Sequence, residues 1–178
     1  MFHVAGLFVA LTVITLIAGY LSKREKNSIY HLALWIMFAI YVAGYLYFVF
    51  WSRNPGSESR VNLTPFQTYF HLFDRSESGE RFATNFQLIG LESAVPLVGI
   101  LLNILLYYPL GYFLLTLFPK LKAWHVLLIA CSCSVITEAI QYIIQIGWCE
   151  TDDVLHNIVG AVLGVEIFRL QRRFDKHY

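Results

Sequence analysis

The sequence predicts an all-α polytopic integral membrane protein with about five transmembrane helices. The chain of 178 residues is 57% hydrophobic and 14% charged, with a mean hydropathy of +0.58, whereas a soluble domain has about a quarter of its residues charged. Its apolar residues fall into runs near the roughly 20 residues that a helix needs to cross the hydrocarbon core. We therefore predict one membrane domain, residues 1–178, with spans at 2–21, 29–51, 94–118, 124–146 and 154–170, a loop at 52–93 and a tail at 171–178.

The ends of the predicted spans are marked by particular residues. The first run has no basic segment before it and no A-x-A cleavage pattern, so we interpret it as a retained helix and not as a signal peptide. The second ends at Trp51, an aromatic residue suited to the membrane interface, shortly before Pro55 and Gly56 break the run. The third is closed by Pro119, and the fifth is followed by a basic tail.

The basic residues predict how the chain is oriented in a bacterial cell membrane. One side of the predicted membrane carries nine of the thirteen Lys and Arg residues: Lys23, Arg24, Lys26, Lys120, Lys122, Arg169, Arg172, Arg173 and Lys176. The loop at 52–93 carries the other four. Because Lys and Arg near span ends stay in the cytoplasm, we predict a cytoplasmic C-terminus, an extracytoplasmic loop and an N-terminus outside.

The long extracytoplasmic loop contains a predicted amphipathic interfacial segment. Phe66, Tyr69, Phe70 and Phe73 are three and four residues apart, a spacing that places them on one face of a short helix. A helix with such a face lies in the membrane interface with its rings among the lipids.

Polar residues in the fourth and fifth spans are spaced so that they can meet. Ser134, Glu138 and Gln141 share one face of the fourth span, and Asp153 and Asn157 share one face of the fifth. The short connection between these spans makes them antiparallel neighbours. Their polar faces can therefore lie against each other.

The third span and the loop add further residues to this predicted site. Counted at about 1.5 Å per residue, Asn103 lies roughly 13 Å and Glu138 roughly 12 Å from the outer surface. Arg60 and Asn62 in the extracytoplasmic loop can cover these polar residues from the outer side. The candidate substrate-binding residues are Arg60, Asn62, Asn103, Gln141, Asp152 and Asn157.

Glu138 and Asp153 are the candidate catalytic residues. A carboxylate within a membrane is costly, and such a residue is a functional candidate by default. Two carboxyl groups in unlike environments, Glu138 buried and Asp153 near water, can provide a general acid and a general base. The planar guanidinium of Arg60 suits phosphate or carboxylate because it binds two oxygens at once. Whether a reaction is catalysed stays open.

Purely structural interpretations also stay open. Gly160 and Gly164 fit small-xxx-small packing between helices, and Asn103 and Gln141 fit interhelical hydrogen bonds.

The acids at the start of the fifth span also have purely structural interpretations. Asp152 fits a solvated residue or the N-cap of the fifth span, and Asp153 fits the first turn of that helix, where negative charge is favourable. Asp152 and His156 are four residues apart, but without further ligands they predict no metal site. No cofactor is predicted.

Four sequence motifs follow one another between residues 60 and 164. They are Arg60, Asn62, Leu63, Pro65 and Phe66; Asn103 with Pro109, Leu110 and Gly111; Glu138 with Gln141; and Asp152, Asp153, Asn157, Gly160 and Gly164. With these motifs the chain resembles the VanZ-like family of bacterial membrane proteins. It departs from that pattern just before Asp152, where family members often carry a basic residue and this chain has Glu150.

The resemblance implies a compartment and a role in resistance. The founding member of the family is a determinant of low-level resistance to the glycopeptide antibiotic teicoplanin. The implied function is a cell-envelope membrane protein that contributes to glycopeptide and lipoglycopeptide resistance, with an outward-facing polar site that binds or modifies an amphiphilic anionic envelope molecule. The implied partners are membrane lipids and either a lipid-linked envelope precursor or a lipoglycopeptide.

Two alternative functions stay open at this point. One is a small transporter or flippase, and the other is a structural partner in a larger envelope complex. The sequence has no basic stripe of the kind that follows a phosphate backbone, so no nucleic-acid partner is predicted.

Overall fold

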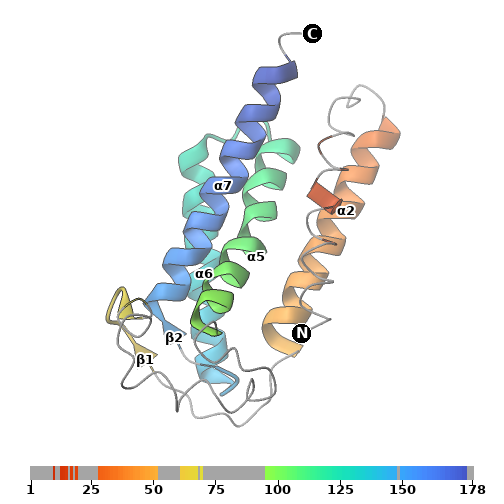
Figure 1. The fold of residues 1–178 in the computed structure, drawn as a ribbon. Coiled ribbons are helices and arrows are strands. Elements are labelled where there is room, and N and C mark those ends of the chain that lie inside the picture. Colours follow the sequence, from red (N-terminus) through yellow and green to blue (C-terminus); the bar gives the residue numbers. More distant parts are fainter. Residues whose placement is uncertain are drawn as a thin grey trace.

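The described part of the chain is built almost entirely from helices. The computed structural model describes residues 10, 13–15, 17, 19, 28–51, 61–67, 69, 95–147 and 149–175. The named elements in chain order are helix α2 (Ser28–Leu46), the π-helical segment η1 (Tyr47–Trp51), strand β1 (Val61–Asn62), helix α5 (Val95–Leu117), helix α6 (Ala123–Ile143), strand β2 (Cys149–Glu150) and helix α7 (Thr151–Asp175). Figure 1 shows the long helices lying along one common direction, with β1 and β2 at one end.

Three described helical segments are long and apolar enough to cross a membrane: Ser28–Trp51, Leu97–Leu117 and Ala123–Ile143. They occupy the ranges predicted for the second, third and fourth spans. Helix α7 runs to Asp175, so the tail predicted from residue 171 begins inside this helix, because no Gly or Pro ends it after Leu170. The first predicted span falls mostly outside the described residues, and the count of about five spans stays a prediction.

Helices α5, α6 and α7 pack together, with α6 antiparallel to both others (Figure 1). Glycines allow α7 to touch the backbone of α5. A Cβ atom on Gly160 would lie 2.1 Å from the carbonyl oxygen of Ile104, and one on Gly164 would lie 2.0 Å from that of Tyr108. Since real Cβ atoms do not approach so closely, only glycine permits this contact. The packing interpretation of these two glycines therefore holds, within one chain.

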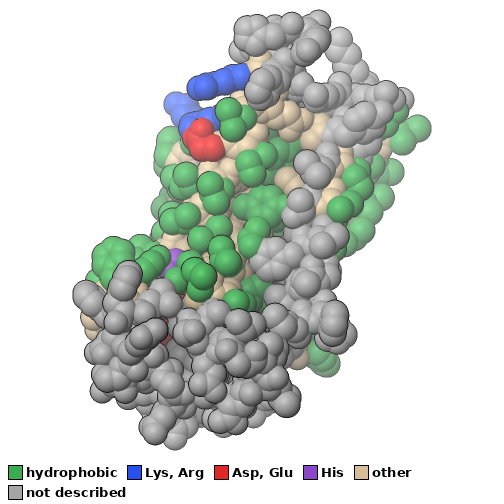
Figure 2. All heavy atoms as spheres, viewed as in Figure 1, with side chains coloured by type: hydrophobic (Ala, Val, Ile, Leu, Met, Phe, Trp, Pro, Cys, Tyr) green, Lys and Arg blue, Asp and Glu red, His purple; other side chains and the backbone are tan. Residues whose placement is uncertain are grey.

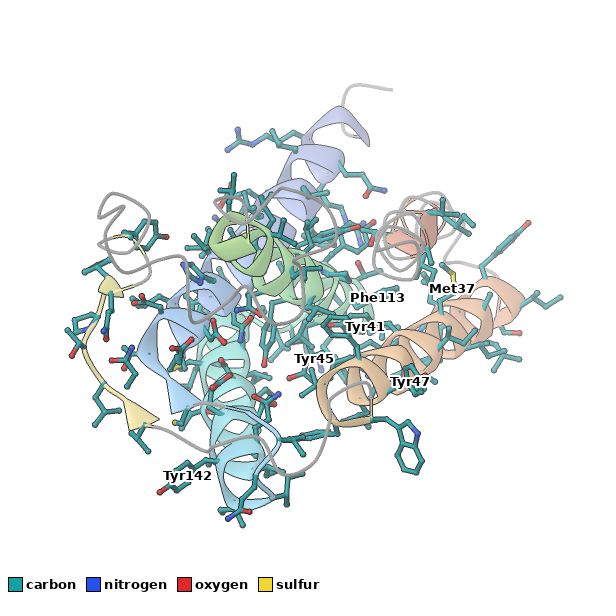
Figure 3. All side chains as sticks on the ribbon, turned by 60° about the horizontal axis from the view of Figure 1, so that its bottom comes forward. Met37, Tyr41, Tyr45, Tyr47, Phe113 and Tyr142 are labelled. Carbon is teal, nitrogen blue, oxygen red and sulfur yellow. The ribbon has the colours of Figure 1, made fainter. Side chains whose placement is uncertain are left out.

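Helix α2 packs against α5 through aromatic rings. Phe113 on α5 is fully buried, and its ring centroid lies 5.7 Å from that of Phe38 and 6.0 Å from that of Tyr41. Figure 3 shows Phe113 and Tyr41 together between the two helices. The Tyr41 hydroxyl donates a hydrogen bond to the carbonyl oxygen of Leu106 at 2.7 Å. This contact joins the two helices by a polar bond as well as by packing.

A second hydrogen-bonded group joins α2, α5 and α6. The hydroxyl oxygen of Tyr45 lies 2.8 Å from that of Tyr107 and 2.8 Å from Oγ1 of Thr137. Each helix supplies one of these residues, so each polar group finds a partner away from water.

The described charged residues separate toward the two ends of the bundle. The end formed by the α5–α6 connection and the last turns of α7 carries Lys120, Lys122, Arg169, Arg172 and Arg173. Figure 2 shows Lys and Arg side chains gathered at this end and a mostly hydrophobic flank along the helices. The opposite end carries Glu150, Asp152 and Asp153. Among the described residues, no Lys or Arg lies at the acidic end.

Candidate functional site

A short parallel ribbon holds a loop segment, of which the structure describes residues 61–67 and 69, beside the α6–α7 connection. Val61 pairs with Cys149, and Asn62 pairs with Glu150. Strand β2 leads directly into α7. The ribbon therefore brings the segment after β1 to the N-terminal end of α7, at the acidic end of the bundle (Figure 1).

Asp152 fastens this loop segment to α7. Its Oδ1 atom accepts a hydrogen bond from the backbone N–H of Phe66 at 2.5 Å, and the residue is only 2% exposed. Phe66 has a φ angle of 65°, a left-handed conformation that is uncommon for a bulky residue. The hydrogen bond from the Phe66 N–H to Asp152 stabilises this left-handed conformation of Phe66. Thr151 Oγ1 adds a long contact of 3.5 Å to the carbonyl oxygen of Asn62.

His156 makes a second contact between α7 and the loop segment. Its Nε2 atom lies 2.9 Å from the hydroxyl oxygen of Tyr69, and the two ring centroids are 5.7 Å apart. His156 is buried, with 3% of its surface exposed. One ring that was predicted to face lipid, that of Tyr69, thus packs on α7. Phe70 and Phe73 of the predicted aromatic face lie outside the described residues.

Glu138 points from α6 toward the connection to α7. Its Oε2 atom accepts a hydrogen bond from the backbone N–H of Glu150 at 3.1 Å, and the residue is 4% exposed. A carboxylate acceptor makes such a bond stronger than a neutral one. The contact places the acid of α6 directly against β2.

Two amide side chains link α7 to its neighbours. Asn103 Nδ2 donates a hydrogen bond to Asp153 Oδ1 at 2.6 Å, which joins α5 to α7. One helical turn further along α7, Asn157 Nδ2 donates to Ser134 Oγ at 2.8 Å, which joins α6 to α7. The polar faces of α6 and α7 therefore lie against each other, and α5 reaches the same region.

Gln141 connects α6 to the end of the α2–η1 segment. Its Nε2 atom donates a hydrogen bond to the carbonyl oxygen of Val49 at 3.1 Å, and the residue is 1% exposed. The last carbonyl oxygens of a helical segment have no partner within the segment. Gln141 satisfies one of them.

The thiol of Cys149 lies in a negative electrostatic environment. Burial raises its pKa, and the carboxylates of Glu138, Asp153 and Glu150 raise it further. Each of these negative charges disfavours the thiolate. Glu138 on α6, Glu150 on β2 and Asp153 on α7 therefore all lie near the Cys149 thiol.

Comparison with known proteins places the chain in a family. A family model described as VanZ/LLP1 matches residues 28–172. The chain belongs to the VanZ family. The matched range includes β1, β2, the loop segment and every candidate site residue. No curated protein and no solved structure shows significant similarity to this VanZ-family chain.

Seven of the eight predicted site residues of this VanZ-family protein lie in the half of the bundle next to β1 and β2: Asn62, Asn103, Glu138, Gln141, Asp152, Asp153 and Asn157. The eighth, Arg60, lies outside the described residues. These seven residues do not all contact one another, and several have different partners. Gln141 faces η1, Asp152 faces the loop segment, and the Oδ1 atom of Asn62 accepts a hydrogen bond from the nearby Thr64 N–H at 3.2 Å.

Sequence reasoning missed the contact between His156 and Tyr69 in the VanZ-family chain. Two signals were present in the sequence. His156 follows Asp152 by four residues and therefore shares its helical face, and Tyr69 belongs to the same short segment as Phe66. The sequence did not show that the two segments meet.

Replacing Val61 with cysteine is expected to produce an intrachain disulfide with Cys149. Neighbouring strands are about 4.8 Å apart, within the separation that a disulfide spans, and paired residues point to the same side of the ribbon. The test is mild oxidation of Val61→Cys in a background that lacks the free cysteines Cys131 and Cys133, followed by mass spectrometry. Leu63→Cys is the control, because Leu63 lies beyond the paired residues. Equal cross-linking of both variants would contradict the register.

Proposed function

We propose that this VanZ-family protein acts at the outer face of the bacterial cell membrane and contributes to resistance against teicoplanin-type glycopeptides and lipoglycopeptides. Its polar site binds or modifies an amphiphilic anionic envelope molecule. The observation that carries the proposal is the buried Glu138, which lies against β2 in the same region as the Asn103–Asp153 pair. An acid at this depth in a membrane protein is costly and is typical of a functional site.

The separation of charge supports the outward orientation in this proposal. Lys and Arg residues in short connections and tails favour the cytoplasmic side. In the proposed arrangement of about five spans, the end with Lys120, Lys122 and the C-terminal turns of α7 is cytoplasmic. The end with β1 and β2 then faces outward, as does the N-terminus.

The proposal gives the residues different tasks. Glu138 and Asp153 bind the ligand or transfer protons. Arg60 immediately precedes Val61 in the sequence and orients the anionic group. Asp152 is a positioning residue, because its carboxylate bonds the Phe66 N–H.

The two alternative functions receive less support. The small-residue stripe that suggested a structural partner is covered by α5 of the same chain at Gly160 and Gly164, so it offers no free surface there. A transporter needs two halves that move around a central site, and a single chain of about five spans has little room for this.

Replacing Glu138 with glutamine or Asp153 with asparagine is expected to reduce resistance to the level of the host without the protein. Each change keeps the size of the side chain and removes its ability to carry negative charge. The measurement is the minimum inhibitory concentration of teicoplanin and of a lipoglycopeptide in a susceptible host, at matched amounts of membrane-inserted protein. Glu166→Gln is the matched control, because Glu166 is exposed at the opposite end and pairs with Arg169. Unchanged resistance in both site variants would refute the proposed site.

A further inference from the structure

The end of the bundle opposite β1 and β2 carries more positive charge than its own acids neutralise (Figure 2). It consists of the α5–α6 connection and the last turns of α7. Among the residues that the structure describes there, five are basic and two are acidic. The basic residues, named the basic rim from here on, are Lys120, Lys122, Arg169, Arg172 and Arg173, and the acidic residues are Glu166 and Asp175.

Three members of the basic rim carry a charge that no acid in the described part of the chain neutralises by direct contact. Lys120, Lys122 and Arg173 are exposed, and none of them forms an ion pair with another described residue. Arg169, in contrast, pairs with Glu166. Exposed ammonium and guanidinium groups form their strongest hydrogen bonds with carboxylate or phosphate oxygens. The basic rim can therefore bind an anion from outside the chain.

Packing beneath the basic rim brings its two parts to one place. Phe168 on α7 packs against the same buried cluster as Leu121 and Ala123. These two residues lie on either side of Lys122 in the sequence. The guanidinium carbon of Arg172 lies 5.3 Å from the centroid of the Phe168 ring, within the distance of a cation–π contact. The α5–α6 connection and the last turns of α7 therefore meet at one cluster.

Exposed apolar side chains begin directly beside the basic rim. Trp124 follows Lys122 by two residues and is 58% exposed, and Leu128, about one turn further along α6, is 59% exposed. On α7, Ile167 and Leu170 are 42% and 49% exposed. Tryptophan is enriched at the level of the lipid head groups in membrane proteins. The basic rim therefore lies at the level of the lipid phosphates, with apolar side chains next to it on the bilayer side.

We infer that the basic rim binds anionic phospholipids of the leaflet around it. A phospholipid supplies a phosphate for the exposed cations and acyl chains for the apolar side chains beside them. A soluble acidic partner would leave those apolar side chains uncovered. Clusters of Lys and Arg next to membrane-spanning helices attract anionic head groups. The inference concerns the end of the bundle opposite the proposed site and does not rest on the proposed function.

The experiment compares two lipids that have the same phosphate and acyl chains. Phosphatidylglycerol is anionic, whereas a choline ammonium group makes phosphatidylcholine zwitterionic. Purified full-length protein in detergent is incubated with equal amounts of both lipids, unbound lipid is removed by size-exclusion chromatography, and retained lipid is quantified by mass spectrometry. We expect about fivefold stronger retention of phosphatidylglycerol at low salt. Equal retention of the two lipids overturns the inference, and this comparison needs no variant.

Salt separates an electrostatic preference from a preference for the shape of the head group. Exposed charges are largely screened at high ionic strength. The preference for phosphatidylglycerol is therefore expected to fall below about twofold when the incubation contains about 0.5 M NaCl. A preference that does not change with salt contradicts binding by the exposed cations.

Variants locate the preference within the molecule. Replacing Lys120, Lys122 and Arg173 together with glutamine is expected to lower the retention ratio of the two lipids below about twofold, and circular dichroism checks that the helices are intact. Lys120→Arg combined with Lys122→Arg is the matched control, because it keeps both charges and is expected to keep the ratio of the unmodified protein. An unchanged ratio in the glutamine variant overturns the assignment to the basic rim.

Discussion

Replacing Gly164 with alanine is expected to lower the free energy of unfolding by about 3 kcal/mol or more, at the upper end of what overpacking costs. The new Cβ atom would lie 2.0 Å from the carbonyl oxygen of Tyr108 and 2.7 Å from the backbone nitrogen of Tyr112. Neither atom belongs to a flexible side chain, so α5 and α7 must separate along their length. Separation also disturbs the Asn103–Asp153 contact, which joins the same two helices.

The chain offers two matched controls for this substitution. Gly44 on α2 and Gly99 on α5 have no neighbouring atom within 4 Å of an added Cβ. Alanine there is expected to be neutral or to stabilise the helix by up to about 1 kcal/mol. The measurement is unfolding in detergent, followed by circular dichroism, for all three variants. If Gly164→Ala unfolds like Gly99→Ala, the close approach of α5 and α7 is wrong.

Replacing Phe113 with alanine is expected to lower the free energy of unfolding by about 2–4 kcal/mol and to loosen α2 from α5. The value lies below the roughly 3–5 kcal/mol of soluble cores, because detergent or lipid, and not water, surrounds the side chain after unfolding. Phe113 is 0% exposed and is the ring on α5 that contacts both Phe38 and Tyr41. Its loss leaves a cavity between two helices.

Tyr47→Ala provides the comparison for the Phe113 variant. Tyr47 is likewise aromatic, but it lies in the α2–η1 segment and is 63% exposed. Its removal is expected to change the free energy of unfolding by less than about 0.5 kcal/mol. The two variants are compared by thermal unfolding and by protease sensitivity of the connection after Trp51. Equal stability of the two variants would show that the aromatic contact does not hold α2 in place.

Local patterns in the sequence predicted the helices and much of the polar contact between them. The spacing of Ser134 and Glu138 on α6, and of Asp153 and Asn157 on α7, places each pair on one helical face, and a short connection brings the faces together. The structure shows the Asn157–Ser134 bond across this interface. Matching depth in the membrane predicted that Asn103 lies level with Glu138, whereas the hydrogen-bond partner of Asn103 in the structure is Asp153.

The contacts of the loop segment could not be predicted in the same way. Strands of two residues leave no alternating pattern, so nothing in the sequence paired Val61 with Cys149. The role of Asp152 also depended on this pairing, because its partner is the backbone N–H of Phe66, far away in the sequence.

The sequence by itself determined the helical membrane character of this VanZ-family protein, its polar faces and its charge asymmetry, because periodicity and composition act within single segments. Only the tertiary structure decided that Gly160 and Gly164 pack against α5, that Asp152 and His156 hold the loop segment, and that Gln141 faces η1. Each of these contacts joins residues that are distant in the chain. Their partners are selected by how whole helices pack, and no local pattern records that choice.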